Sequence, residues 1–139
     1  MRELTKSDCA SVLIVAITPR LEGGAIDVEG ATRNVRYLMD AGADFIMPMC
    51  GTGLVYDATL EEYETTVGAF VDAAAGQALI VPGIGPGFGR SLEMAHIARG
   101  LGVAGAMVMP VVWRRWWLVF PLQALQAFGH DGKRFGAEF

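Results

Sequence analysis

The sequence predicts an α/β fold whose strands form one parallel sheet. Apolar, β-branched runs alternate with amphipathic segments, giving three strand–helix units and a fourth strand. The loops that follow the strands are richer in glycine than the loops that precede them. Successive strand–helix–strand units favour right-handed crossovers and therefore parallel neighbours. Function in such sheets gathers at the carboxyl ends of the strands, so we expect the site there.

The first strand is expected over residues 11–17, SVLIVAI, because a nearly continuous apolar run is typical of a strand buried on both faces. Thr18-Pro19 ends it, since the residue before proline avoids the helical conformation. A helix should begin at Asp27 and end at Gly42. Its expected buried face consists of Val28, Ala31, Val35, Leu38 and Met39.

The second unit begins with a predicted strand over residues 41–49, AGADFIMPM. A helix over residues 60–75 should follow and end at Gly76. Thr59 and Glu62 have the capping-box spacing that starts such a helix. Its expected inward face consists of Tyr63, Val67, Phe70 and Val71.

The remaining predicted elements are a strand over 78–83, a helix over 91–101 and a strand over 103–109. The glycine-rich segment IGPGFG, residues 84–89, satisfies G-x-G-x-x-G in no phase, so nucleotide binding is not predicted. We interpret it as a mobile loop at the active face. His96 lies within the third helix, and we interpret its lone imidazole as structural.

The turn CGTGL after the second strand is the main candidate site. Thr52 lies between Gly51 and Gly53, and glycine lets a backbone approach a ligand closely. The Thr52 hydroxyl and the amides of the same turn could together hold a carboxylate or a phosphate. The same spacing also suits a tight turn without a ligand. We expect four strand ends to share one rim: Thr18-Pro19, Cys50 to Leu54, Gly83 to Gly89, and Pro110 to Val112.

Charge and composition narrow the classes of function. A net charge of −4, with no basic stripe among aromatic residues before the last forty positions, argues against a nucleic-acid partner. Cys9 and Cys50 form no CxxC motif, which favours free thiols in a reducing cytosol. Charges of both signs over residues 1–11 are unlike a signal peptide, and Arg114 and Arg115 interrupt the longest apolar run. We expect a cytoplasmic protein with no membrane span, metal or cofactor.

Four motifs, one at each strand end, share their order and spacing with a known family. They are VAITPR, CGTGL followed by ATLEEY, ALIVPGIG, and ARGLGVAGAMVMPVV. Over about residues 11–112 they resemble the dihydrodipicolinate synthase/N-acetylneuraminate lyase family. The resemblance implies that residues 1–112 are the first four βα units of a TIM (β/α)8 barrel, in a family that is commonly tetrameric, so a homo-oligomer is expected. A complete barrel usually needs about 250 residues.

The resemblance also implies an activity. Members of that family are lyases in which a barrel lysine forms a Schiff base with pyruvate or another 2-oxo acid, so that an enamine can form. By the same resemblance, Gly51, Thr52 and Gly53 hold the carboxylate of the oxo acid, with Thr52 as the principal contact. No residue of this chain is assigned a catalytic role.

The sequence departs from the family at several positions. Gly51 stands where synthases usually carry a first hydroxyl residue, and Leu54 replaces the usual glutamate. Val111 and Val112 stand where a tyrosine pair is expected. A threonine–tyrosine proton relay therefore cannot operate, which favours a dehydratase-like or aldolase-like relative over a strict dihydrodipicolinate synthase.

The family lysine has no equivalent in the chain. Lys133 lies in the polar segment HDGKRFG and is interpreted as a solvated charge. We therefore expect a truncated family member that is inactive alone. The alternative is a non-catalytic half barrel that binds a carboxylate at Thr52 or a phosphate at Gly83 to Gly89.

The last segment, residues 113–139, differs in composition from the rest of the chain. All three tryptophans fall between Trp113 and Trp117, and no acidic residue occurs from Met94 to His130. We interpret this tail either as read out of frame or as an amphipathic helix that packs on the half-sheet or on a membrane surface.

In a half barrel, the outermost strands would lack hydrogen-bond partners on one side. The first and fourth strands would each leave one edge unpaired. The side chains expected to face inward without an opposite wall are Val12, Ile14, Ile80 and Met107. We expect a dimer, an aggregate, or a fold in which residues 113–128 cover the open face.

Overall fold

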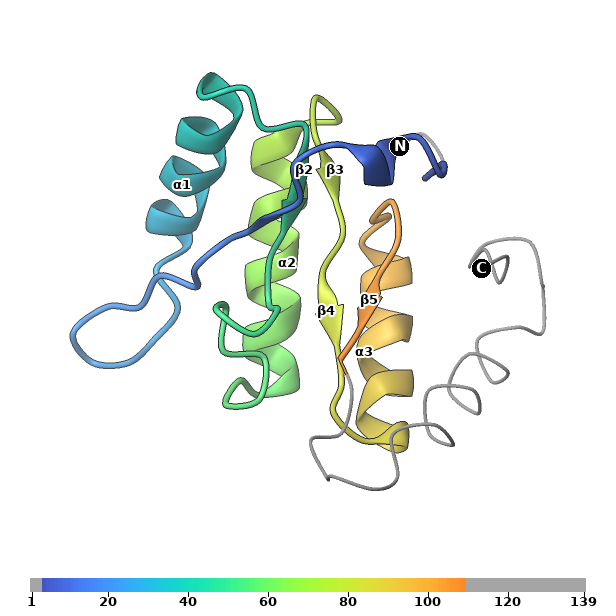
Figure 1. Cartoon of the computed structure of the whole chain (residues 1–139). Coiled ribbons are helices and arrows are strands. Elements are labelled where there is room, and N and C mark those ends of the chain that lie inside the picture. Colours follow the sequence, from blue (N-terminus) through green and yellow to red (C-terminus); the bar gives the residue numbers. More distant parts are fainter. Residues whose placement is uncertain (1–3, 110–139) are drawn as a thin grey trace.

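The computed structural model describes residues 4–109, which form successive strand–helix units with the helices side by side (Figure 1). Strand ends beyond Met109, the tail over 113–139 and Lys133 lie outside the described residues. The elements are, in order, the 3-10 turn η1 (Asp8–Ala10), β1 (Ile14–Val15), α1 (Val28–Asp40), β2 (Phe45–Met47), α2 (Leu60–Ala74), β3 (Leu79–Ile80), β4 (Gly83–Ile84), α3 (Phe88–Gly100) and β5 (Met107–Val108).

Every strand pair among these residues is parallel, which confirms the predicted α/β class. β1 pairs with β2, β2 with β3, and β4 with β5. The single strand expected over 78–83 is instead divided into β3 and β4 around Pro82, because proline has no N–H to donate to a neighbouring strand. The amide of Met107 still donates to the Pro82 carbonyl at 2.9 Å, so this segment joins β2 on one side to β5 on the other.

The side chains of the strands alternate between two faces. On the helix side, Ile46 and Ile80 pack with Val35 of α1 and Phe70 of α2. On the other face lies a second buried cluster, formed by Phe45, Met47, Cys50, Leu79 and Val81. Ile14 and Ile80 were expected on the inner face of a barrel, and both predictions are wrong, because each of these residues pairs with Ile46 and shares its face. Met107 does pack against the inner cluster, as expected.

The first strand is shorter and more exposed than expected. β1 has two residues, and the prediction that residues 11–17 are buried on both faces is wrong. Val12 is 73% exposed and Ile17 is 57% exposed. The physical reason is that β1 is an edge: within residues 4–109 it has β2 on one side and no strand on the other.

The first helix begins and ends as its sequence predicts. The side chain of Asp27 accepts a hydrogen bond from the Gly30 amide at 2.8 Å. At the other end, Gly42 has φ +92°, and its amide donates to the Met39 carbonyl at 2.9 Å. Ala31 and Val35 are buried, and Leu38 and Met39 are partly buried. Val28, at the first position of the helix, is 45% exposed and does not join the buried face.

The capping box of the second helix is present. The Thr59 side chain accepts from the Glu62 amide at 3.1 Å, and the Glu62 carboxylate accepts from the Thr59 amide at 2.9 Å. Tyr63, Val67 and Phe70 are fully buried, as predicted.

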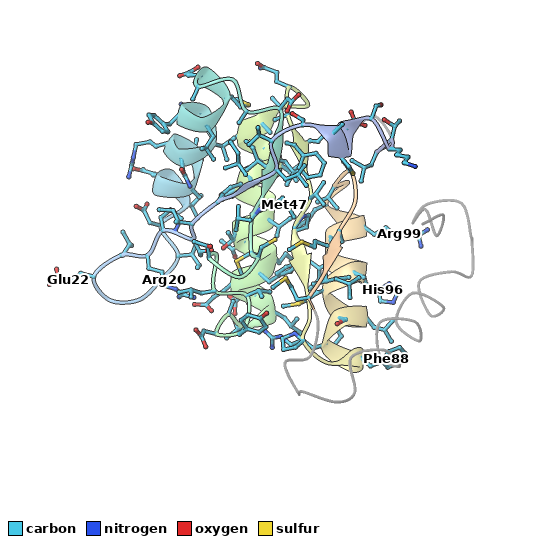
Figure 2. All side chains as sticks on the ribbon, viewed as in Figure 1. Arg20, Glu22, Met47, Phe88, His96 and Arg99 are labelled. Atoms are coloured by element: carbon cyan, nitrogen blue, oxygen red, sulfur yellow. The ribbon has the colours of Figure 1, made fainter. Side chains whose placement is uncertain are left out.

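The third helix begins at Phe88, not at Ser91, and is preceded by Gly87 with φ +91°. The expected mobile loop is therefore largely occupied by β4 and by the first turn of α3. His96 is exposed and projects from the outer side of α3 (Figure 2). Among residues 4–109, no helix is long and apolar enough to cross a membrane.

Candidate functional site

The carboxyl ends of the described strands meet at one rim, at the lower end of the view in Figure 1. The hydroxyl of Thr18, after β1, donates to the Gly53 carbonyl at 2.6 Å. The Gly83 amide of β4 donates to the Pro48 carbonyl after β2 at 3.0 Å. The Met109 amide after β5 donates to the carbonyl of Ile84 at 2.8 Å. These bonds bring the predicted strand ends together, apart from Pro110 to Val112, which lie outside the described residues.

The candidate turn contains hydrogen-bond donors without acceptors, and of its three residues Gly51 and Thr52 are exposed and Gly53 is buried. Within residues 4–109, the amides of Gly51, Thr52 and Gly53 have no backbone or side-chain acceptor. Thr52 is exposed, and its hydroxyl has no partner in the same part of the chain. The turn itself is closed by the Leu54 amide, which donates to the Gly51 carbonyl at 3.1 Å. Three successive free amides and a free hydroxyl are a donor set that suits an anion.

The two glycines beside Thr52 have different structural roles. A Cβ atom on Gly53 would lie 2.8 Å from the Met49 nitrogen and 3.1 Å from the Ala16 carbonyl oxygen. Such distances leave no room for a side chain, so glycine at this position lets the turn pack against the end of β1. Among residues 4–109, a Cβ atom on Gly51 would meet only the Met109 methyl carbon, at 3.9 Å. Within this part of the chain, the space beside Gly51 is therefore open.

Two residues with positive φ flank the turn. Met49 has φ +53° and Leu54 has φ +57°. This left-handed region is unfavourable for residues other than glycine and is often found at functional sites. Met49 is buried, whereas the Leu54 side chain is 50% exposed. The turn is thus held in a strained shape by the packing beneath it.

An ion pair next to the rim joins the loop after β1 to the start of α2. Arg20 Nη1 lies 2.5 Å from Glu62 Oε1 and also donates to the Gly24 carbonyl at 2.6 Å. Figure 2 shows Arg20 turned from this loop toward α2. The hydrogen bond from Arg20, together with that from the Thr59 amide, lowers the pKa of Glu62 to about 2. The sequence alone predicted only a capping role for Glu62. The one signal for the ion pair was Arg20 itself, a charged residue at a position where the resembling family has Phe or Met.

Two buried polar groups lie behind the turn. Burial raises the pKa of the Cys50 thiol to about 11, although a backbone hydrogen bond with Gly83 acts the other way. Burial also raises the pKa of Tyr63, and the nearby Cys50 adds to the effect. The Tyr63 hydroxyl has no hydrogen-bond partner among the described residues. A thiol in this setting stays protonated near neutral pH and is a poor nucleophile.

Other reactive groups are absent from the described rim. Residues 4–109 contain no group of three or more His, Cys, Asp or Glu side chains that could hold a metal ion. The only lysine in this part of the chain is Lys6, which precedes β1 and therefore lies away from the carboxyl ends. Within residues 4–109, the rim therefore presents hydrogen-bond donors and no lysine amine.

Parallel strands covered by one layer of helices define an incomplete (β/α)8 barrel within residues 4–109. The chain belongs to the dihydrodipicolinate synthetase family, whose sequence profile matches residues 8–114.

The similar sequences carry two kinds of name. The chain is 34% identical over 110 residues to the probable 5-dehydro-4-deoxyglucarate dehydratase 2 of Streptomyces coelicolor, covering 79% of this chain and 34% of the relative. It is also 34% identical over 99 residues to a 4-hydroxy-tetrahydrodipicolinate synthase of Acidothermus cellulolyticus, covering 70% of this chain and 32% of that relative. The chain thus spans about a third of the length of these relatives.

Solved structures show the same fold relationship. A dihydrodipicolinate synthase from Bacillus clausii superposes with a TM-score of 0.73 at 29% identity, over 81% of this chain and 40% of that chain. An N-acetylneuraminate lyase from Mycoplasma synoviae has a TM-score of 0.69 at 19% identity, over 75% of this chain and 36% of that chain, and shares the fold.

Proposed function

We propose that the turn Gly51-Thr52-Gly53 binds the carboxylate of a small 2-oxo acid such as pyruvate. The proposal rests on the hydrogen-bond donors of this turn. Three successive amides have no acceptor within residues 4–109, and the Thr52 hydroxyl beside them is also free within this part of the chain. A carboxylate has two acceptor oxygens that can share these donors, and hydrogen bonds to a charged acceptor are stronger than neutral ones.

The rim fixes the donors before a ligand arrives. The Thr18 hydroxyl holds the Gly53 carbonyl, and the backbone of Gly53 packs against the Ala16 carbonyl. A turn that is already shaped loses little conformational entropy on binding. This preorganisation supports a specific site over an ordinary loop.

Membership of the family supports a reaction class. We propose a lyase of the aldolase or dehydratase kind, in which a lysine amine condenses with the ketone of the oxo acid, water leaves, and the iminium carbon accepts electrons from the adjacent carbon. Within this scheme the turn would hold the carboxylate and aim the ketone away from it. The described rim supplies no lysine, so we propose that the 139-residue chain binds the acid without forming the imine.

A dehydratase-like role is favoured over a strict dihydrodipicolinate synthase. Gly51 lacks the hydroxyl that the synthases of the resembling family carry, and Leu54 lacks their carboxylate. The name of the Streptomyces coelicolor relative is consistent with this preference. The alternative is phosphate binding at the start of α3, where Gly87 provides no side-chain cap for the helix amides.

Isothermal titration with pyruvate tests the binding step. Thr52→Val removes the hydroxyl but keeps the shape of the side chain, and we expect the dissociation constant to rise about tenfold, as for one hydrogen bond to a charged group. Thr65→Val, at an exposed position of α2, is the matched control and should bind as the parent does. Equal affinity of the parent and Thr52→Val would contradict the proposal, and tighter binding of glucose 6-phosphate than of pyruvate would favour the alternative.

Borohydride reduction in the presence of pyruvate tests the chemical step. We expect no mass increase on the chain, because an imine must form before borohydride can fix it. A stable adduct would show that Lys6 or Lys133 reacts with the ketone, and would overturn the proposal that the chain only binds.

We also propose a cytoplasmic location and a homo-oligomeric state. The first rests on two free thiols, exposed Cys9 and buried Cys50, which suit a reducing compartment. The second rests on the edge of β1, which has no neighbouring strand on one side within residues 4–109.

A further inference from the structure

We propose that two copies of this chain associate through their open sheet edges, with β5 of each copy pairing in parallel with β1 of the other. The resulting assembly would be a closed barrel of two equal halves. This proposal concerns a protein interface and does not depend on the binding of an oxo acid.

The open edge of β1 combines unpaired backbone N–H and C=O groups with apolar side chains. Ile14 pairs with Ile46, and the Ala16 amide donates to the Met47 carbonyl at 3.1 Å, so the even-numbered residues bond to β2. The N–H and C=O groups of the alternate residues must then point to the open side. These residues are Leu13, Val15 and Ile17, whose side chains are 42%, 38% and 57% exposed. An unpaired apolar edge of this kind is a template for another strand.

The edge of β5 has the complementary arrangement. The amides of Met107 and Met109 donate toward β4, to the carbonyls of Pro82 and Ile84, at 2.9 Å and 2.8 Å. The intervening N–H and C=O groups, those of Val108, therefore point away from β4. Within residues 4–109 they have no partner. The Val108 N–H and C=O groups of β5 could therefore bond to the unpaired C=O and N–H groups on the open edge of β1 in another copy.

A second copy fits both edges at once. All strand pairs are parallel, so a twofold axis running along the strands sets β5 of each copy beside β1 of the other in the same direction. Four strand positions cannot close on themselves, whereas about eight give a filled barrel interior. The chain covers 38–41% of several full barrels that it matches, close to half of a closed ring.

The interior of such a barrel would receive suitable side chains. By the alternation of β1, Leu13, Val15 and Ile17 lie on the same face as the buried inner cluster that contains Phe45 and Met47. Closure would bury these three exposed side chains against the partner. Both copies of the Thr52 turn would then open at the same end of the barrel.

Sedimentation and light scattering of the full chain test the interface. We expect a concentration-dependent dimer. Ile17→Lys places a charge on the inner face of the open edge and should raise the dimer dissociation constant at least tenfold. Val15→Pro removes only an N–H that faces the open side, so it should weaken the dimer while keeping the bonds from β1 to β2. Tyr37→Lys, at a 71% exposed position of α1, is the matched control and should leave the dimer unchanged.

Hydrogen exchange adds a readout at the edge itself. The amides of Val15 and Val108 should be protected in the parent dimer and should lose that protection in Ile17→Lys, while helical circular dichroism is retained. If Val15→Pro does not fold, Ile17→Lys alone decides the question. A parent chain that stays monomeric on concentration, or a dimer that neither variant weakens, would overturn the proposal.

Discussion

The hydroxyl of Thr18 donates a 2.6 Å hydrogen bond to the carbonyl oxygen of Gly53, a residue 35 positions further along the chain. This bond fastens the turn after β2 to the end of β1. In the turn that this bond holds, the amides of Gly51, Thr52 and Gly53 have no acceptor among the described residues. The shape of the candidate site therefore depends on a side chain that does not itself offer a donor to the ligand.

Replacing Thr18 with valine should loosen the turn. The variant loses a part-buried hydrogen bond and leaves the Gly53 carbonyl without its partner, so we expect a loss of about 1 kcal/mol in the free energy of unfolding. Pyruvate affinity should fall as well, because the turn is less well ordered. Urea denaturation and titration measure the two effects. Unchanged stability together with unchanged affinity would show that this bond is unimportant.

The two glycines of the turn should respond differently to alanine. Gly53→Ala forces a Cβ atom to within 2.8 Å of the Met49 nitrogen, and we expect destabilisation of about 1–3 kcal/mol. Gly51→Ala places its Cβ atom 3.9 Å from the nearest atom that it would meet among the described residues, the Met109 methyl carbon, and should change stability by less than about 0.5 kcal/mol. Thermal unfolding of the pair provides the comparison, and equal losses would contradict the described packing.

The Arg20–Glu62 pair should make stability depend on pH in the acid range. Because folding lowers the pKa of Glu62 to about 2, its ionised form stabilises the fold above its ordinary pKa near 4.5. That contribution is lost as the pH falls toward 2. The side chains are 29% and 26% exposed, so solvent screening reduces the expected contribution to about 1 kcal/mol.

Glu62→Gln is the variant that isolates this charge. Glutamine can still occupy the third helical position of a capping box, so the variant mainly removes the ion pair. Its free energy of unfolding should be lower than that of the parent at pH 7 and nearly equal to it at pH 2. A constant difference across this range would mean that the charge is not responsible.

The end of α2 offers a stabilising change. Ala75 has φ +47°, a left-handed conformation that is unfavourable for alanine and accessible to glycine. Ala75→Gly should raise the free energy of unfolding by about 0.5–1 kcal/mol. Ala41→Gly is the control, because the corresponding residue of α1 has φ −80° and gains nothing from glycine. Stabilisation by both changes would contradict this explanation.

The two thiols should differ in reactivity. Cys9 is exposed, whereas Cys50 is buried, and its pKa is raised to about 11. A disulfide reagent at pH 8 should therefore label Cys9 rapidly and Cys50 only on unfolding. Cys9→Ser, which leaves Cys50 as the reporter, should show almost no labelling in native buffer. Rapid labelling of that variant would mean that the rim opens readily.

Much of the fold follows from local patterns in the sequence. Asp27, Thr59 and Glu62 determine where helices begin, because each satisfies backbone amides that the first turn leaves free. Gly42 ends α1 because its backbone conformation is left-handed. The alternation of apolar strands with amphipathic helices predicted the parallel arrangement and the shared rim.

Other features depend on contacts between distant residues and are not contained in any local pattern. The apolar run over 11–17 has the composition of a central strand, but it lies at an edge, and burial depends on neighbours. The face on which Ile80 lies is set by its register with Ile46. The bond from Thr18 to Gly53 and the pair of Arg20 with Glu62 likewise arise only when the chain folds.

Backbone amide shifts during a pyruvate titration address the binding site itself. In nitrogen–proton spectra, the amides of Gly51, Thr52 and Gly53 should shift together with saturation, and Thr52→Val should weaken that response about tenfold. Thr65→Val should give the parent response. Absence of any shift at these three amides, or an undiminished response in Thr52→Val, would contradict carboxylate binding at this turn.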